Sequence, residues 1–177
     1  MDMLRKTHLA TGLAATSIFM RTPKDFLVIG LFTALGSLMP DIDAPAASIF
    51  KRLEYISYLV ILSFIYIFFS DKVIPFIFLA ILTVFAATRK HRTFTHSILS
   101  MLSFTACIAC ISVKGAIFFT VGYGLHLLCD SLTIMGVPLF HPFVEKRFSF
   151  KVMKTGSKED RMLGALCILI FFGIIAI

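Results

Sequence analysis

The chain has 177 residues, of which 58% are hydrophobic and only 15% are charged, and its net charge is +7. Soluble domains are about 45–50% apolar and about 25% charged, so this composition excludes an ordinary soluble domain and predicts an integral membrane protein. The basic residues lie in the breaks between apolar segments and form no basic helix or arm. They therefore indicate contact with a membrane surface, and we expect no nucleic-acid partner.

Apolar segments separated by turns rich in Pro, Asp and Lys follow one another along the chain. They cover about residues 7–20, 26–39, 55–69, 73–88, 97–113, 115–135 and 162–177. Helices are favoured, because an open sheet could not satisfy its backbone hydrogen bonds in lipid. A full span takes about 20 residues, so some segments are short or re-entrant. We predict an all-α, polytopic transmembrane bundle of about five to seven helices that forms a single domain, residues 1–177.

The basic residues also predict the orientation of this bundle. With the N-terminus in the cytoplasm and each segment reversing the chain, four of the 17 Lys and Arg residues lie on the outer side. These four are Arg21, Lys24, Lys72 and Lys114. All the others lie on the cytoplasmic side, as the positive-inside rule requires.

The first candidate ligands lie at the start of the first segment and after the end of the second. His8 opens the first segment, where an interfacial histidine is an ordinary alternative. In Pro40-Asp41-Ile42-Asp43-Ala44-Pro45 the prolines disfavour helix, and residues two apart in an extended chain point to one side. Asp41 and Asp43 could then share one cation. The alternative is a helix stop with two solvated Asp residues, since Asp is common in turns.

A second group surrounds the turn before the fifth segment, in Arg89-Lys90-His91-Arg92-Thr93-Phe94-Thr95-His96-Ser97. Thr95 or Ser97 could cap the following helix, whose first amides would favour an anion. A basic cytoplasmic turn is the alternative, and it explains the Arg and Lys residues better than the histidines.

His126 and Asp130 have the i, i+4 spacing that places both side chains on one helix face of an apolar segment. An Asp near the centre of a membrane costs about 2.5–3.5 kcal/mol, which makes it a candidate for function. A private His–Asp hydrogen bond is the alternative. Cys107 and Cys110 form a C-x-x-C in another apolar segment, where free cysteines usually pack as small apolar residues, so the candidate site leaves them out.

The predicted orientation brings these distant residues to the cytoplasmic face. Imidazole and carboxylate groups bind zinc, and also manganese or iron. The candidate metal ligands are His8, Asp41, Asp43, His91, His96, His126 and Asp130, with Glu159 as a further carboxylate. One catalytic zinc needs about three protein ligands, so the set predicts either two ions or one ion with surrounding groups and a general base.

These motifs together resemble a known family, the YdjM-like bacterial inner-membrane proteins, which are membrane-bound metal-dependent hydrolases. The matching elements are Thr7-His8 with Gly12, Pro40 to Asp43, His91 to Ser97, His126 with Asp130, and Thr155-Gly156-Ser157 followed by Glu159. His141 departs from the family pattern, where an aromatic residue is common, so it is left out of the ligand set. The resemblance implies a multi-pass hydrolase of the bacterial inner membrane.

The favoured function is hydrolysis of a lipid or other membrane-associated substrate, with a phosphoester preferred and zinc as the favoured ion. The candidate catalytic residues are Asp41, Arg92, Asp130 and Glu159, with Arg92 stabilising charge on a phosphoryl oxygen. The basic stretch 146–158 would attract anionic headgroups. The alternative is a non-enzymatic protein, either a metal or proton transporter or a metal-stabilised structural factor. Transport is disfavoured because the outer half is poor in polar residues. The oligomeric state is not predicted.

Overall fold

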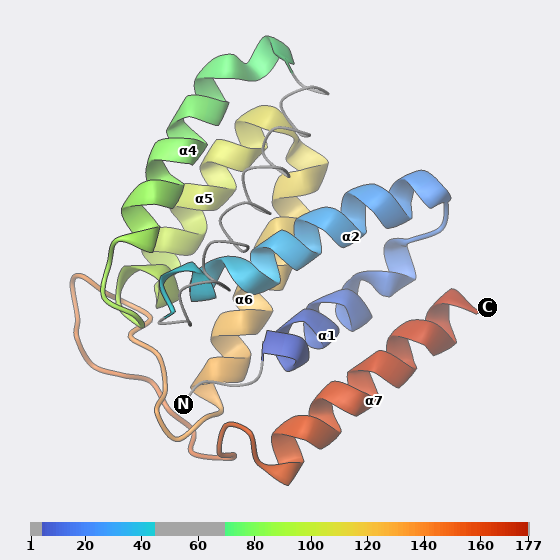
Figure 1. Ribbon diagram of the computed structural model, residues 1–177, viewed down its shortest axis with the longest axis vertical. Coiled ribbons are helices and arrows are strands. Elements are labelled where there is room, and N and C mark those ends of the chain that lie inside the picture. Colours follow the sequence, from blue (N-terminus) through green and yellow to red (C-terminus); the bar gives the residue numbers. More distant parts are fainter. Residues whose placement is uncertain (1–4, 45–69, 177) are drawn as a thin grey trace, which may run out of the picture.

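The computed structural model describes residues 5–44 and 70–176, and these residues are mainly helical (Figure 1). The α-helices are α1 (Arg5–Thr16), α2 (Pro23–Leu38), α4 (Val73–Ala87), α5 (Ile98–Ile111), α6 (Val113–Ser131) and α7 (Lys158–Ile175). Short 3₁₀ turns are η1 (Ser17–Phe19), η2 (Met39–Asp43), η3 (Ser70–Lys72) and η4 (Phe94–His96). The described part of the chain contains no β-strand, only isolated bridges such as Val137 with Phe148. The all-α prediction is confirmed for these residues, and the predicted segment 55–69 lies outside them.

Hydroxyl side chains set the starts of several helices. Thr22 caps α2 by accepting a hydrogen bond from the Asp25 amide, and Pro23 follows at the first helical position. Ser97 caps α5, so Ser97 and not Thr95 is the capping residue of the turn before the fifth segment. Ser157 caps α7, which therefore begins at Lys158, before the predicted start near residue 162.

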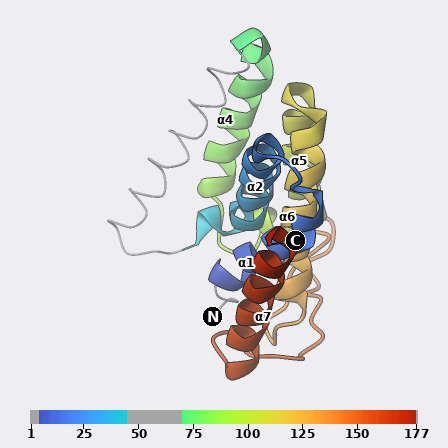
Figure 2. The ribbon, with the colours of Figure 1, turned by 90° about the vertical axis from the view of Figure 1, so that its right-hand side faces the viewer.

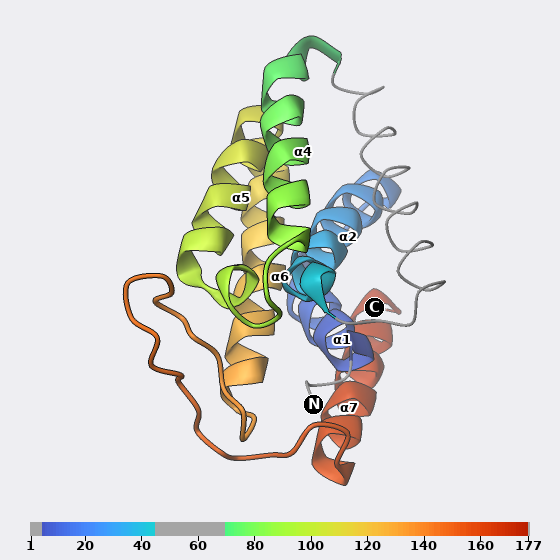
Figure 3. The same cartoon turned by 60° about the vertical axis from the view of Figure 1, so that its left-hand side comes forward.

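The helices form two groups that meet at α6. α4, α5 and α6 lie side by side, and α1, α2 and α7 cross them at an angle (Figure 1). Views from two further directions show the same neighbours, with α1 between α2 and α7 (Figures 2 and 3). The 3₁₀ turn η2, which follows α2, thus lies against the C-terminal part of α6, near His126.

Two glycines allow α2 and α6 to approach closely. A Cβ atom on Gly36 would lie 2.1 Å from the Phe119 carbonyl oxygen, and one on Gly122 would lie 2.4 Å from the Thr33 carbonyl oxygen. Small residues at such contacts let helix backbones pack without side chains between them, as is common in membrane helices. This packing holds the end of α2 against the part of α6 that carries His126.

The described residues give partial support to the predicted membrane bundle. Pro23–Asp43 is the one helical stretch among them that is long and apolar enough to cross a membrane, with 21 residues. α4 and α5 are apolar but shorter. Large exposed apolar side chains lie on α4 and α7, including Ile74 and Leu169. Such surfaces mark contacts with a membrane or a partner, whereas the number of complete spans stays a prediction.

Candidate metal centre

Five predicted site residues from four separate segments meet in the interior, each 0–3% exposed. They are His8 from α1, Asp41 from η2, His96 from η4, and His126 and Asp130 from α6. Their ligand atoms form two overlapping groups that could hold a metal ion, His8 with His126 and Asp130, and Asp41 with His96 and His126. The structure therefore brings together residues that are far apart in the sequence.

The carbonyl group of Ser37 fixes the orientation of the His126 ring. His126 Nδ1 lies 2.7 Å from the Ser37 carbonyl oxygen. Because a carbonyl oxygen only accepts hydrogen bonds, Nδ1 carries the hydrogen and Nε2 of the neutral ring presents a lone pair. Ser37 lies in the last turn of α2, where helix carbonyls lose their intrahelical partners and can accept from a side chain.

A chain of hydrogen bonds fixes His96 in the same way. The Thr95 hydroxyl donates to Asp43 Oδ2 at 2.6 Å, and it lies 3.1 Å from His96 Nδ1. Since the hydroxyl hydrogen is used by the carboxylate, the Thr95 oxygen accepts from His96 Nδ1. The neutral His96 ring therefore also presents the lone pair of Nε2.

Both Nε2 atoms face the same two carboxylates. Asp41 Oδ1 lies 3.8 Å from His96 Nε2 and 3.9 Å from His126 Nε2, and Asp130 Oδ2 lies 3.3 Å and 3.8 Å from the same atoms. Lone pairs would face carboxylate oxygens here, which is unfavourable without a cation between them. Among the described residues, Asp41 Oδ1, His96 Nε2 and His126 Nε2 have no hydrogen-bond partner.

The spacing of these four atoms fits a metal ion. Bonds of about 2.0–2.2 Å in a tetrahedral zinc site place neighbouring ligand atoms roughly 3.3–3.6 Å apart. The four distances from a histidine Nε2 to a carboxylate oxygen, 3.3–3.9 Å, are at this spacing or slightly wider. Two imidazole nitrogens and two carboxylate oxygens are also a donor set that zinc, manganese and iron accept. The residues present therefore fit a divalent transition metal.

Asp41 and Asp43 point to different partners, so the predicted extended D-x-D is wrong. The segment is the 3₁₀ turn η2, because α2 continues into a tighter helical turn in which Pro40 takes an early position that needs no N–H donor. With about three residues per turn, side chains two apart no longer share a face. Asp43 Oδ1 lies 2.7 Å from His91 Nδ1, and Asp43 Oδ2 accepts from Thr95.

Asp43 lies beside the metal centre and does not face the proposed ion position. Asp43, His91 and His96 form a third group whose ligand atoms could hold an ion. However, both Asp43 oxygens and His96 Nδ1 already take part in hydrogen bonds. We assign Asp43 to orienting His96 through Thr95.

His8 extends the centre on its other side. Its ring stacks on His126 with centroids 3.7 Å apart, and His8 Nε2 lies 3.3 Å from Asp130 Oδ1. Asp130 thus contacts His8 with one oxygen and faces His96 with the other. This arrangement leaves both predicted ion counts open, because His8 can donate a hydrogen bond to Asp130 or help bind a second ion.

Arg92 is a buried cation beside these carboxylates. Its Nη2 donates to Asp130 Oδ2 at 3.0 Å and its Nη1 to the Gly136 carbonyl oxygen at 3.3 Å. The backbone φ of Arg92 is 59°, in the left-handed region that non-glycine residues rarely adopt and that often marks a functional position. The guanidinium offsets part of the negative charge of Asp130.

Glu159 lies outside this cluster, exposed in the first turn of α7. A hydrogen bond from Ser157 lowers the pKa of the Glu159 carboxyl group. Its neighbour Asp160 is buried instead, where it accepts hydrogen bonds from the Thr7 hydroxyl and the Gly156 amide, both at 2.8 Å. Asp160 thus joins α7 to α1, next to His8.

Three residues that contribute to the site were not predicted as site residues, namely Ser37, Thr95 and Asp160. Ser37 contacts His126 through its backbone carbonyl group, which every residue has, so its side chain gives no signal in the sequence. The position of Thr95 predicts only a helix cap. Asp160 has a signal in the sequence, because Ser157 three residues before it has the spacing of a helix cap. His141, which the candidate set left out, is half-buried in the loop after α6 and takes no part in the groups that could hold an ion among the described residues.

Comparisons with known proteins identify the family of the chain. A family model described as YdjM inner membrane protein matches residues 3–177. The chain is also similar to the uncharacterized protein YvsG of Bacillus subtilis (strain 168), with 27% identity over 164 residues that cover 91% of this chain and 87% of that protein. No solved structure matches the chain. Because the family model spans nearly the whole sequence, the chain belongs to the YdjM family of inner membrane proteins.

Proposed function

We propose that this protein is a membrane-embedded, metal-dependent hydrolase whose ion is held by Asp41, His96, His126 and Asp130, with zinc favoured. One observation carries the proposal. Two histidines with fixed tautomers direct their Nε2 lone pairs at the same two carboxylates. A cation resolves this arrangement, and a buried ion with mixed His and Asp ligands is typical of hydrolytic metal centres.

The residues around this position have separate tasks in the proposed chemistry. With four protein ligands, an ion here would have to bind water as a fifth ligand. It would then lower the pKa of that water, so that the water could act as hydroxide near neutral pH. Ser37 and Thr95 hold the two imidazole rings in the orientation that binds the ion. Arg92, paired with Asp130, would stabilise negative charge that develops on a phosphoryl oxygen. Glu159 lies outside the cluster, and the proposal does not use it.

The proposed substrate is a lipid or membrane-associated phosphoester. The loop after α6 exposes basic residues together with large apolar ones. They are Phe143, Lys146, Arg147, Phe150, Lys151 and Lys154. Basic and aromatic side chains together suit the headgroup region of an anionic membrane. The family to which the chain belongs is found in the inner membrane, where such substrates are abundant.

The burial of the centre favours a second candidate function, a metal-stabilised membrane protein without catalysis. His8, His96, His126 and Asp130 have no exposed surface in the described structure. A substrate must reach a hydrolytic ion, whereas a structural zinc is closed to solvent. The two functions share the metal and differ in whether water and substrate can reach it.

The first experiment tests the metal. The protein is purified in detergent, repleted with zinc, manganese or iron, freed of loose ions, and analysed for elemental composition. We expect about one tightly bound ion per chain, and strong loss of that ion in His126→Ala and Asp41→Ala. His141→Ala is the matched control, because that histidine lies outside the cluster, and it should bind as the wild type does. No ion in the repleted wild type, or full occupancy in both site variants, would refute the centre.

The second experiment tests the chemistry. Metal-loaded protein is assayed against phospholipids and phosphate monoesters, with Arg92→Gln beside the wild type. Hydrolysis that depends on the metal and falls in Arg92→Gln by more than tenfold supports the proposal. A metal-loaded protein that is inert on all substrates and melts at lower temperature without its ion supports the structural role. Ion movement into liposomes would instead support a transporter.

A further inference from the structure

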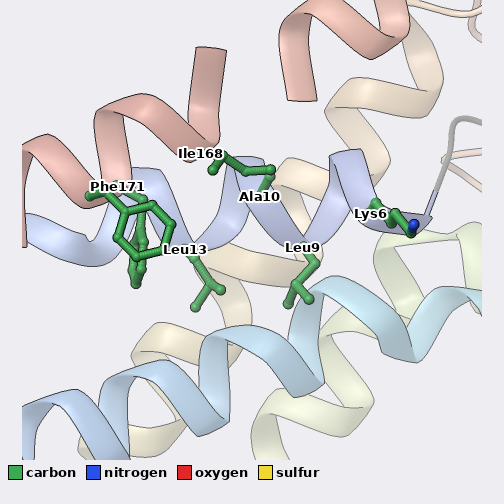
Figure 4. Close-up of a pocket in the computed structure, with 7 residues that line it drawn as sticks. Lys6, Leu9, Ala10, Leu13, Ile168 and Phe171 are labelled. Carbon is green, nitrogen blue, oxygen red and sulfur yellow. The ribbon is translucent and has the colours of Figure 1, made fainter. Parts of the chain in front are cut away.

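An apolar groove of about 330 Å³ runs between α1 and α7. Its lining consists of Lys6, Leu9, Ala10, Leu13, Ile168, Phe171 and Phe172. Lys6 lies at one end of the groove and Phe171 near the other (Figure 4). The volume is at the lower end of the range of small-ligand sites, which is about 300–1,000 Å³. The groove therefore has one cationic end and a wholly apolar body.

Close packing along one face of α1 leaves this groove beside it. Thr7 contacts Asp160 and approaches Gly164, and further along Ala10 and Ala14 pack against Cys167. Later residues of α1 contact later residues of α7, so the two helices run parallel. The longer side chains on the adjacent faces then line the open space between the helices.

A single acyl chain matches the body of the groove, and a phosphate matches its cationic end. Phe172 is 63% exposed and Ile168 is 46% exposed, although both are apolar, so this face needs an apolar cover. Lys6 is exposed at the start of α1. In the predicted orientation this start lies at the cytoplasmic surface, where anionic headgroups attract Lys and Arg.

We propose that the groove between α1 and α7 binds one acyl chain of an anionic phospholipid, with Lys6 beside the phosphate. The chain belongs to an inner-membrane family, so this ligand surrounds the protein. The site lies next to the metal centre, because Arg5 donates to the Asp41 carbonyl oxygen at 3.3 Å. Naming the bound phospholipid as the substrate rests on the proposed function, whereas the lipid site itself does not.

Fluorescence quenching tests the site, because the chain contains no tryptophan. Phe172→Trp places one indole in the groove, and Phe78→Trp places one on α4, with parent side chains 63% and 60% exposed. Each protein in detergent is titrated with phosphatidylglycerol that is brominated on its acyl chains. We expect Phe172→Trp to be quenched at a several-fold lower lipid fraction than Phe78→Trp. Phe171→Trp is a second reporter if Phe172→Trp does not fold.

The role of Lys6 has its own control. Lys6→Gln in the Phe172→Trp background should weaken the response to phosphatidylglycerol by about fivefold, as expected for one basic residue at an anionic surface. Lys24→Gln, an exposed lysine at the start of α2, should leave it unchanged. The response to brominated phosphatidylcholine should not depend on Lys6.

Two results would overturn the lipid site. One is equal quenching of Phe172→Trp and Phe78→Trp, and the other is an equal effect of Lys6→Gln and Lys24→Gln. Metal content and hydrolysis are measured on the same preparations. Preferential quenching in a protein without hydrolytic activity would support the lipid site and refute the hydrolase. Hydrolysis without preferential quenching would support the hydrolase and refute the lipid site.

Discussion

The imidazole rings of His96 and His126 use their Nδ1 hydrogens on partners outside the centre. His126 donates to Ser37 and His96 to Thr95. Groups that hold the second nitrogen of a ligating histidine set its tautomer and increase its basicity. Thr95 has the more specific role, because it also donates to Asp43 and so connects a carboxylate to the ring.

At the residue scale, we expect Thr95→Val to weaken metal binding about 10–100-fold, since the ring of His96 would lose the acceptor that fixes its tautomer. Thr95→Ser keeps the hydroxyl and should bind nearly as the wild type does. Competition with a chelator of known affinity measures the effect. The matched control is Thr83→Val, which removes a buried hydroxyl that donates only to the Leu79 carbonyl oxygen of its own helix. Wild-type affinity in Thr95→Val would show that the tautomer is fixed by other groups.

At the element scale, the packing of α2 on α6 determines where the ligands lie. α2 leads to Asp41 and supplies the Ser37 carbonyl, and α6 supplies His126 and Asp130. A methyl group between these helices would separate groups that must meet within a few ångströms. The metal centre therefore depends on residues that never contact the ion.

We expect Gly122→Ala to destabilise the protein and reduce metal binding, because the new Cβ would lie 2.4 Å from the Thr33 carbonyl oxygen and a backbone atom cannot easily move away. Gly173→Ala is the matched control, since a Cβ there meets no atom within 4 Å. Thermal unfolding and metal content are measured for both. An unchanged melting temperature and full occupancy in Gly122→Ala would mean that α2 and α6 pack less closely than described.

Local patterns predicted the helices well, and the spacing of His126 and Asp130 correctly placed both on a buried face of α6. The conformation around Asp41 was predicted wrongly, since proline spacing favours an extended chain but the preceding helix continued as a 3₁₀ turn. The pairing of Thr95 with Asp43 and the approach of Gly36 to Phe119 depend on tertiary packing. No local spacing encodes such contacts, so they could not be predicted from one sequence.

At the scale of the whole molecule, the metal would connect three segments that are far apart in the sequence, η2, η4 and α6. Asp41 and Asp130 are buried carboxylates. Arg5 and Arg92 offset their negative charge in part, and without a metal the rest of that charge opposes folding. We expect metal removal by a chelator to lower the melting temperature, and zinc to restore it. An ion present at 100 times its dissociation constant stabilises the folded state by about 2.7 kcal/mol. His126→Ala should show no zinc-dependent shift, and a wild type that melts at one temperature with and without zinc would contradict a metal in this position.

Two ion pairs lie at opposite ends of α2, and the predicted topology assigns them to opposite sides of the membrane. Asp25 at the start of α2 pairs with Lys114 at the start of α6, at 2.5 Å, and Lys114 and Lys24, the neighbour of Asp25, were predicted to lie outside the cytoplasm. Asp43 and His91 pair at 2.7 Å beside the metal centre, and both were predicted on the cytoplasmic side. Each ion pair thus joins residues that the distribution of basic residues assigns to the same side of the membrane.

Cysteine labelling in intact cells would test this topology. In a background without the four native cysteines, Lys24→Cys and Lys114→Cys should react with an impermeant maleimide added outside. Lys90→Cys and Lys154→Cys should react only after the membrane is opened. The parent lysines are all exposed, so access to the reagent and not burial decides the result. Labelling of Lys24→Cys and Lys90→Cys from the same side would mean that α2 does not cross the membrane. The centre would then need a different route to the cytoplasm, because Asp25 and Asp43 would no longer be separated by lipid.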